Sequence, residues 1–328
     1  MNFDLQIDPP AAARDIEASI RDIVLSRLRR KGVVVGLSGG VDSSVVAALS
    51  ARALGAERVL GLLMPEADSS PESLRLGRMV AQQLGIRSFV EDVSGILDAA
   101  GCYRRRDEAI RSLVPEYHDG WRCKLVFPDL VDRAGYAVYS LVLVAPSGAE
   151  MRVRLTADAY LGIVAATNFK QRVRKMMEYY YADRWRFAVA GTPNLLEYDQ
   201  GFFVKNGDGA ADLKPIAHLY KSQVYQLAEY LDLPGEIRRR PPTTDTYPLE
   251  QSQEEFYFGL SLQKTDMCLY ARDHDVPAAE AAPWVGLTTE QVERVYAMID
   301  SKREAARYLH APPLVSNAMT TESLKFCW

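Results

Sequence analysis

Residues 33–54 restrict the fold because they combine a short apolar run, a turn with two adjacent glycines and an apolar helical stretch. The run Val33–Leu37 holds three valines, a leucine and one glycine but no polar residue, which is typical of a strand buried on both faces of a parallel sheet. Ser38–Ser44 predicts a turn, and Val45–Leu54 predicts a helix. Such a strand–turn–helix unit is part of a βαβ crossover, so we expect an α/β fold.

The alternation of strand and helix continues along the chain. Residues 11–31 place isoleucine, valine and leucine on one stripe and predict an amphipathic helix that ends at Gly32. The pattern predicts a doubly wound parallel sheet with helices on both faces. The further predicted strands are Val59–Met64, Ser88–Glu91 and Phe187–Gly191, and the further predicted helices are Glu72–Leu84, Ala159–Asp183 and His218–Leu231.

Two regions depart from this alternation. Between about 94 and 157, the β-rich runs Tyr136–Ala145 and Met151–Leu155 flank a Pro-Ser-Gly turn, which predicts a β-hairpin insertion. From about 245 to 328 the sequence indicates loops and short helices, an irregular helical C-terminal extension. Since there is no internal repeat or low-complexity tract, we expect residues 1–328 to form a single domain.

The turn after the first strand is suited to bind phosphate. Gly39 and Gly40 let the backbone approach an anion closely, and the following helix adds its positive end. The turn has neither the GxxxxGK[ST] nor the GxGxxG pattern. Asp42 would repel phosphate unless a cation lies between them, and Mg²⁺ takes carboxylate and phosphate oxygens together. An ordinary helix cap is the alternative, but the complete strand–turn–helix context favours the phosphate site.

Composition excludes several classes of protein. Lys and Arg number 39 and Asp and Glu 43, a net charge of −4, which argues against a nucleic-acid coat. We expect Arg104–Arg106 and Arg238–Arg240 to be solvated or to flank turns. No signal-peptide pattern or membrane-length apolar stretch is present, so we expect a cytoplasmic protein. The cysteines have no CxxC spacing and predict reduced structural thiols: Cys102, Cys123, Cys268 and Cys327.

Ser38-Gly-Gly-Val-Asp-Ser-Ser44 resembles the pyrophosphate loop of the N-type ATP pyrophosphatases, which have the adenine nucleotide alpha hydrolase-like fold. These enzymes cleave ATP between its α- and β-phosphates and adenylate an acceptor. Several subfamilies share this loop. The chain resembles the NAD synthetases more specifically, over roughly 14–92 and 157–244, through ordered motifs at Asn168–Arg174, Gly191–Glu197, Gly201–Asp208 and Asp212–Lys221.

The resemblance implies that Mg·ATP adenylates nicotinic acid adenine dinucleotide (deamido-NAD) and that ammonia then displaces AMP to give NAD. It implies catalytic roles for Asp42 and Lys221, and Mg²⁺ ligation by Asp42 and Glu197. It also implies ATP contacts and dinucleotide contacts. The ATP set is Gly36, Leu37, Ser38, Gly39, Gly40, Val41, Asp42, Ser43, Met64, Thr192, Lys221 and Thr243; the dinucleotide set is Asn168, Arg172, Lys205, Asp208 and Asp212.

Physical chemistry independently favours some of these roles. Glu197 follows closely after a predicted strand, at the carboxyl edge where open α/β sheets bind ligands. Lys221 offers a point charge suited to phosphate. Asn168 and Arg172 are four residues apart on one predicted helix, so both can reach one ligand.

Three features depart from the family pattern. Leu195-Leu196 stand where a polar or basic residue is usual, and the insertion is longer than expected. The His-Lys-Arg element that usually precedes a Pro-Pro and contacts the nicotinate end is missing; the chain has Ser301–Arg303 and, separately, His310–Pro313. The half that binds ATP therefore matches the family more fully than the half that binds the acceptor.

The family also implies partners. Only about 32 residues precede the first predicted strand, so we expect no nitrilase-like glutaminase region, and ammonia would be free or supplied by a separate glutaminase. The resemblance further implies a homodimer. The tyrosine-rich stretch Tyr179–Tyr181 is a candidate contact, and a core stripe is the alternative.

The sequence is also compatible with competing functions. The enzyme could be a paralogue that amidates another carboxylate. A tRNA-modifying ATP pyrophosphatase would be expected to carry a catalytic cysteine pair or a basic RNA-binding face, neither of which is found. A non-catalytic nucleotide-binding protein is the third class, and the presence of both Asp42 and Glu197 argues against it.

Overall fold

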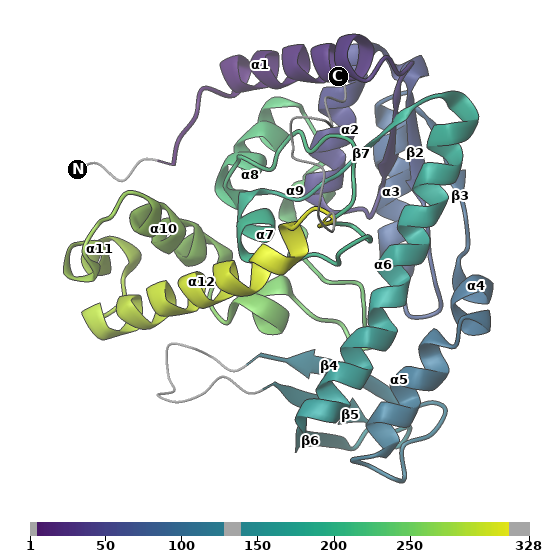
Figure 1. The fold of residues 1–328 in the computed structure, drawn as a ribbon, viewed down its shortest axis with the longest axis vertical. Helices are drawn as coiled ribbons and strands as arrows, with labels where there is room; N and C mark the ends of the chain where they lie inside the picture. The colour runs from purple at the N-terminus through teal and green to yellow at the C-terminus, as the bar shows by residue number, and fades with distance from the viewer. Residues whose placement is uncertain (1–4, 128–138, 315–328) are drawn as a thin grey trace.

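The computed structural model describes residues 5–127 and 139–314, and its centre is a four-stranded parallel sheet (Figure 1). Strand β1 pairs on one side with β2 and on the other with β7, and β2 pairs with β3. The order β3–β2–β1–β7 makes the carboxyl ends of β1 and β7 a topological switch point, where open α/β sheets bind ligands. The strands are β1 Val33–Gly36, β2 Val59–Leu63, β3 Arg87–Val90 and β7 Ala188–Ala190.

Helices cover both faces of this sheet, which confirms the predicted doubly wound fold. Val33 and Val35 pack into a core with helices α1, α2, α3 and α8, whereas Val34 packs against α6 on the other face. All three valines are fully buried, as the apolar run Val33–Leu37 predicted. The helices are α1 Pro9–Arg21, α2 Val41–Leu54, α3 Pro71–Gln83, α6 Ala157–Trp185 and α8 Lys221–Tyr230.

Two helix ends differ from the prediction. Helix α2 begins at Val41, after Gly40 as its N-cap, so Asp42 lies in the first helical turn. The N-terminal helix continues after α1 as a π-helix, Asp22–Arg27, and the chain then reverses at Arg29, whose φ is 52°. Gly32 therefore does not end the helix. It is needed because a Cβ there would lie 2.2 Å from the Arg58 carbonyl oxygen.

The insertion is larger than the predicted hairpin. Strands β5 (Ser140–Val144) and β6 (Glu150–Arg154) pair antiparallel as expected, but β4 (Arg122–Val126) adds a third strand on the other edge of β5. The start of the predicted run Tyr136–Ala145 lies outside the described residues. Helix α4 (Ser94–Ala99) leads into the insertion, and α5 (Cys102–Arg111) packs along α6.

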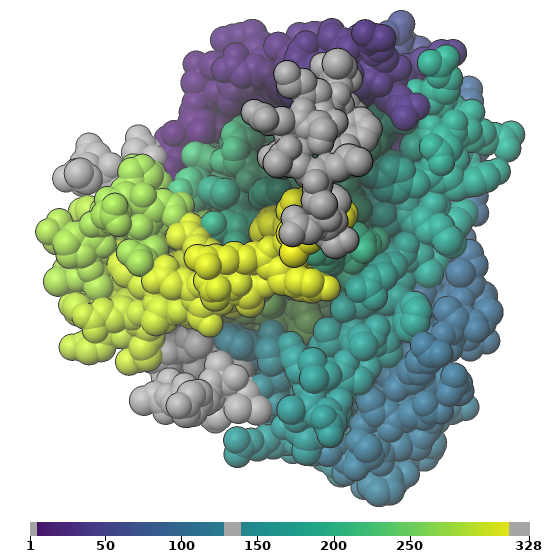
Figure 2. All heavy atoms as spheres, viewed as in Figure 1, coloured from purple at the N-terminus to yellow at the C-terminus, as the bar shows by residue number. Residues whose placement is uncertain are grey.

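The inserted sheet has a core of its own. Buried Leu125 and Leu143 from the sheet pack with Ile110 of α5 and Ile163 of α6. In Figure 2 the insertion (blue) and α6 (teal) form a continuous surface. The 29-residue α6 therefore spans both parts of the molecule, with one end on the parallel sheet and the other on the insertion.

The C-terminal extension is helical, but it is more regular than predicted. Helix α12 runs over 22 residues and packs on α7, α10 and α11. Its buried residues Val292, Val295, Ile299 and Ala306 lie on one face at helical spacing. The remaining elements are η2 Ala56–Arg58, α7 Leu195–Gln200, α9 Gly235–Arg239, η3 Glu254–Phe258, α10 Leu262–Asp273, α11 Ala278–Val285 and α12 Thr289–His310.

Three of the four cysteines lie in the described part of the chain, and all three are buried free thiols. Burial raises the pKa of Cys102 and of Cys123 to about 11, which leaves little reactive thiolate at neutral pH. Across residues 5–127 and 139–314, the helices are too short or too polar to cross a bilayer.

Replacing Gly32 tests the close approach of the chain before β1. Gly32→Ala should lower the free energy of unfolding by about 1–3 kcal/mol, because the new methyl group collides with a backbone carbonyl that cannot rotate away. Gly95→Ala in α4 is the matched control, because nothing lies within 4 Å of its added Cβ. It should leave stability unchanged or raise it by up to about 1 kcal/mol. Urea unfolding measures the stability of both variants, and equal stabilities would contradict a close backbone approach at Gly32.

Candidate active site

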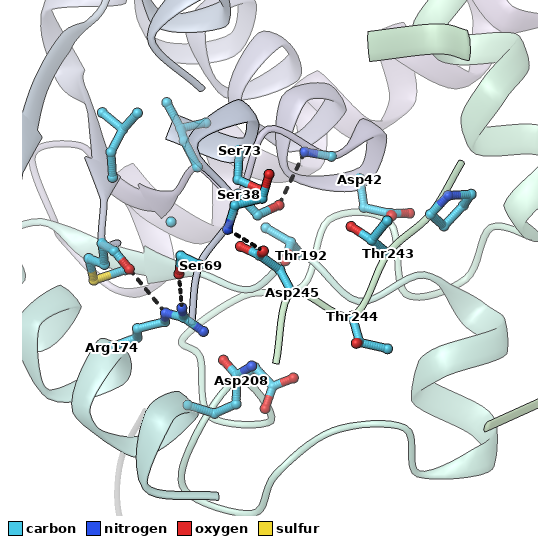
Figure 3. Close-up of a pocket in the computed structure, with 18 of the residues that line it drawn as sticks. Ser38, Asp42, Ser69, Ser73, Arg174, Thr192, Asp208, Thr243, Thr244 and Asp245 are labelled. Atoms are coloured by element: carbon cyan, nitrogen blue, oxygen red, sulfur yellow. Dashed lines mark hydrogen bonds between the residues drawn. The ribbon is translucent and has the colours of Figure 1, made fainter. Parts of the chain in front are cut away.

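A cavity of about 230 Å³ lies at the carboxyl ends of β1 and β2. Its walls are the turn at 36–42, the loop and helix start at 64–74, α6, and the segment 240–245 (Figure 3). Ten residues of the predicted ATP set line it: Gly36, Leu37, Ser38, Gly40, Val41, Asp42, Met64, Thr192, Lys221 and Thr243.

The two other members of that set shape the glycine turn. The Ser43 hydroxyl accepts a hydrogen bond from Ser38 N (3.3 Å) and donates one to Gly40 O (3.1 Å). Gly39 has φ 74°, and a Cβ there would lie 2.6 Å from Ser73 O. Because the first N–H groups of a helix have no intrahelical acceptor, the start of α2 brings donors to the cavity wall.

Asp42 and Glu197, the predicted metal ligands, lie on either side of Asn194. The Asn194 amide donates from Nδ2 to Asp42 Oδ1 (3.0 Å), and its Oδ1 accepts from Glu197 N (3.1 Å), which caps α7. Lys221, at the start of α8 and only 2% exposed, donates from Nζ to Asp42 Oδ2. The lysine predicted to hold phosphate therefore pairs with the aspartate of the turn in this structure.

The charges of this cluster are strongly coupled. Burial, together with the Asp42 carboxylate, raises the pKa of Glu197 to about 7, although Lys221 opposes this rise. Burial lowers the pKa of Lys221, but Asp42 and Glu197 outweigh it and hold that pKa above its ordinary value. Two carboxylates with one nearby ammonium leave this end of the cavity short of positive charge.

This residue set fits Mg²⁺ arriving with a nucleotide. Within the described ranges, no group of three or more His, Cys, Asp or Glu side chains could hold a metal alone. Mg²⁺ is usually held by one or two carboxylates together with substrate phosphates. Two buried oxygens on the cavity lining, Thr244 Oγ1 and Gln253 Oε1, have no protein partner among the described residues, so they are available to a ligand.

The wall opposite Asp42 holds charged residues to which the sequence assigned no role. Arg174 donates from Nε to Met64 O (3.2 Å) and from Nη2 to Ser69 Oγ (3.3 Å), as drawn in Figure 3. Lys175 and Glu178, both buried, form an ion pair of 2.6 Å. The helical spacing of Gln171, Arg174, Lys175 and Glu178 is the sequence signal that could have identified this face.

The predicted dinucleotide set divides into two groups. Asp208 lines the cavity, where burial raises its pKa. The other four members, which include Asn168, are not part of the lining. Arg172 Nε donates to Lys205 O (3.3 Å), and Lys205 Nζ donates to the Tyr308 and Ala311 carbonyls. Asp212 accepts from Val189 N (2.8 Å).

One residue of each arginine run makes contacts that were not predicted. For Arg106 the prediction of a solvated or turn-flanking position was wrong, whereas Arg240, the C-cap of α9, does flank an irregular segment. Arg240 donates to Gly39 O (3.3 Å) and to Ser73 Oγ (2.9 Å) and lines the cavity. Arg106 is 6% exposed and pairs with Asp68 and Asp107. Their partners come from distant parts of the chain, so only the tertiary structure reveals them.

Residues that depart from the family pattern, in 195–196 and 301–303, pack among the C-terminal helices. Leu196 is 1% exposed and packs, with Leu195, in a core with α10 and α12. Arg303 pairs with Asp199 and Asp273, and Lys302 donates to Tyr257 O (2.7 Å). These contacts hold α12 over α7 and α10.

Comparison with known proteins gives a consistent result. The family model described as NAD synthase matches residues 12–113 and 146–307. The NH(3)-dependent NAD(+) synthetase of Mesorhizobium japonicum is 58% identical over 312 residues, which cover 95% of this chain and 98% of that protein. Two solved structures, each covering 95% of this chain and 100% of the other, share the fold: NMN synthetase from Francisella tularensis (TM-score 0.64, 21% identity) and NH3-dependent NAD synthetase from Campylobacter jejuni (TM-score 0.63, 22% identity).

Replacing Asn194 tests whether this end of the cavity attracts a cation. Asn194→Asp keeps a capping oxygen but adds a third carboxylate beside Asp42 and Glu197, and should lower the free energy of unfolding by about 1–3 kcal/mol. Asn194→Ser, the neutral control, keeps a side chain that can cap α7, and its free energy of unfolding should fall by less. Urea unfolding with and without MgCl₂ measures both effects, and Mg²⁺ should restore more stability to the aspartate variant. Equal losses, or no response to Mg²⁺, would contradict a cation site.

Proposed function

The chain belongs to the NAD synthase family, and we propose that it catalyses the ATP-dependent amidation of deamido-NAD, with ammonia as nucleophile. This reaction would make the enzyme a ligase that forms a C–N bond. The observation that carries the proposal is the cavity at the switch point, where the glycine turn meets the Asp42–Asn194–Glu197–Lys221 cluster.

The proposed chemistry has two steps. A carboxylate oxygen of the dinucleotide attacks the α-phosphorus of ATP, and pyrophosphate leaves. Ammonia then attacks the acyl carbon, AMP leaves, and the ammonia nitrogen releases a proton. The turn at 36–43 and the start of α2 would bind the departing pyrophosphate, and Lys221 would stabilise its charge. Asp42 and Glu197 would hold Mg²⁺, which when bound supplies charge neutralisation on the phosphates.

The roles of the other predicted residues form part of the proposal. Met64, Thr192 and Thr243 line the cavity and would contact ATP. Asp208, on the same lining, would meet the dinucleotide where it approaches the α-phosphate. The remaining members of the dinucleotide set lie beyond the lining, so they would bind the part of the substrate that extends out of the cavity: Asn168, Arg172, Lys205 and Asp212.

We infer a homodimer from the family resemblance, with α6 as the candidate contact. Tyr180 is 51% exposed and Met176 53% exposed, one helical turn apart on this helix. Tyr181 and Tyr179 instead pack toward β1 and β2, so the core alternative applies to those two residues.

Ammonia would be free or come from a separate glutaminase. The Mesorhizobium relative, named as NH(3)-dependent, is matched over 98% of its length. A solved NMN synthetase shares this fold, so a mononucleotide carboxylate is the appropriate second substrate to test. Membership of the family favours an amidating enzyme over the tRNA-modifying alternative.

The reaction should be detected by its products. With Mg²⁺, ATP and ammonium chloride, the protein should release AMP and pyrophosphate in equal amounts only when deamido-NAD is present. Liquid chromatography of the nucleotides and a coupled pyrophosphate assay measure this, with nicotinic acid mononucleotide as the comparison. Release of ADP and phosphate would refute the assignment of the turn, and a preference for the mononucleotide would replace the proposed substrate.

Removing the aspartate of the turn tests the proposed metal site. Asp42→Ala should lower kcat by at least about 100-fold, because the phosphate-binding turn loses its charged metal ligand. Asp98→Ala, at an exposed position on α4, is the matched control and should retain full activity. Steady-state kinetics at saturating Mg·ATP give kcat for both variants. Near-normal activity of Asp42→Ala would show that the metal site is elsewhere.

A further inference from the structure

Residues 240–255, here called the strap, form the wall of the cavity that faces the glycine turn. They contribute Thr243, Thr244, Asp245 and Gln253 to the lining, three of which are labelled in Figure 3. Until η3 begins at Glu254 the strap contains no helix or long strand. It folds back on itself through two backbone hydrogen bonds, from Thr244 N to Gln251 O (3.1 Å) and from Gln253 N to Pro242 O (2.9 Å). Its shape therefore depends on contacts with the rest of the molecule.

One end of the strap is fixed to the phosphate-binding side. Arg240 donates to Gly39 O and Ser73 Oγ, which ties the strap to the glycine turn. Asp245 accepts a hydrogen bond from Ser70 N (2.9 Å) and adopts a left-handed backbone with φ 45°. A non-glycine residue keeps such a conformation only when its surroundings impose it.

The middle of the strap, at Thr246, is held by Lys170, a fully buried residue of α6. Its ammonium group donates to Glu66 Oε1 (2.9 Å), Asp68 Oδ2 (2.7 Å) and the Thr246 carbonyl (2.6 Å). All three N–H donors of the lysine are therefore used, two on the loop after β2 and one on the backbone of the strap. A buried ammonium with this complete set of acceptors fixes the two segments relative to each other.

The insertion completes this anchor. From α5, Arg106 pairs with Asp68, and the Tyr103 hydroxyl donates to Glu66 Oε2 (2.8 Å). The edge strand β4 binds the strap directly, because Leu249 N donates to Cys123 O (3.3 Å) and the Gln251 side chain donates to Leu125 O. The family model leaves residues 114–145 unmatched, and these include β4.

We propose that Lys170 is a positioning residue for ATP binding, and that the inserted sheet and α5 serve as the scaffold on which Lys170 holds the strap against the cavity. The inference rests on the proposed function, since it takes the nucleotide to bind in this cavity. A strap released from its anchor would have to be ordered by ATP itself, and that entropic cost weakens binding. The chemical step, carried out by groups on α2, α7 and α8, would proceed normally once ATP was bound.

Neutralising the anchor without leaving unpaired charges gives the cleanest test. The variant Lys170→Met with Glu66→Gln and Asp68→Asn keeps the shape of the cluster but removes the donor to Thr246 O. We expect its KM for ATP to rise about tenfold, the size of one lost hydrogen bond from a charged donor, with kcat changed less than twofold. Hydrogen exchange should be faster at the amides of Thr244 and Gln253. Lys31→Met, at an exposed position, is the control and should show neither effect.

A second variant and a direct binding measurement keep the test decisive. Gln251→Ala removes the contact to β4 at a residue outside the lining, and should raise the KM for ATP in the same direction. Unchanged KM and unchanged exchange in both variants would overturn the proposal, as would equal losses in kcat and in affinity for both substrates, which indicate a merely structural role. Calorimetry with Mg·ATP on the unmodified protein separates the role of Lys170 from the proposed function. If the unmodified protein did not bind Mg·ATP, the proposed function itself would be rejected.

Discussion

Negative charge held beside an anion-binding turn is the constraint on which this site depends. Asp42 lies in the first turn of α2, where the N–H groups and the helix dipole attract phosphate. Glu197 lies close enough to Asp42 that repulsion between the two carboxylates raises the pKa of Glu197. Both carboxylates have hydrogen-bond donors: Asp42 accepts from Asn194 Nδ2 and Lys221 Nζ, and the Glu197 carboxylate accepts from Asn194 N (3.2 Å) and Gln253 Nε2 (2.9 Å). The switch-point topology makes this possible, since it brings the starts of α2, α7 and α8 to one edge of the sheet.

On the other side of the cavity, a second buried lysine also links a helix to neighbouring segments. Lys221 joins α8 to the glycine turn, and Lys170 joins α6 to the loop after β2 and to the strap. Both ammonium groups are almost or completely withdrawn from solvent; Lys221 pairs with Asp42, and Lys170 has acceptors from two separate segments. Such a group is expensive to bury unless every donor is used, so its presence fixes the geometry of the segments that supply those acceptors.

The parts of the chain that depart from the family pattern are parts that support the site. The leucines before Glu197 are covered by α12, which is itself held by Arg303 and Lys302. The insertion packs along α6 and binds the strap through β4. The altered acceptor half thus has a physical explanation: helices and a small sheet brace the segments that enclose the cavity.

Local patterns along the chain are enough to predict the parallel sheet, the glycine turn and the positions of Asp42 and Glu197 just after strands. An apolar run such as Val33–Leu37 identifies a buried strand, and a turn between strand and helix identifies an anion site. The anchoring contacts of Arg106, Arg240 and Lys170, and the face of α6 that meets the cavity, depend on long-range packing that becomes visible only in the folded chain. The chain around an arginine or lysine looks the same whether its charge is solvated or buried; the difference lies in acceptors supplied by segments far away along the sequence.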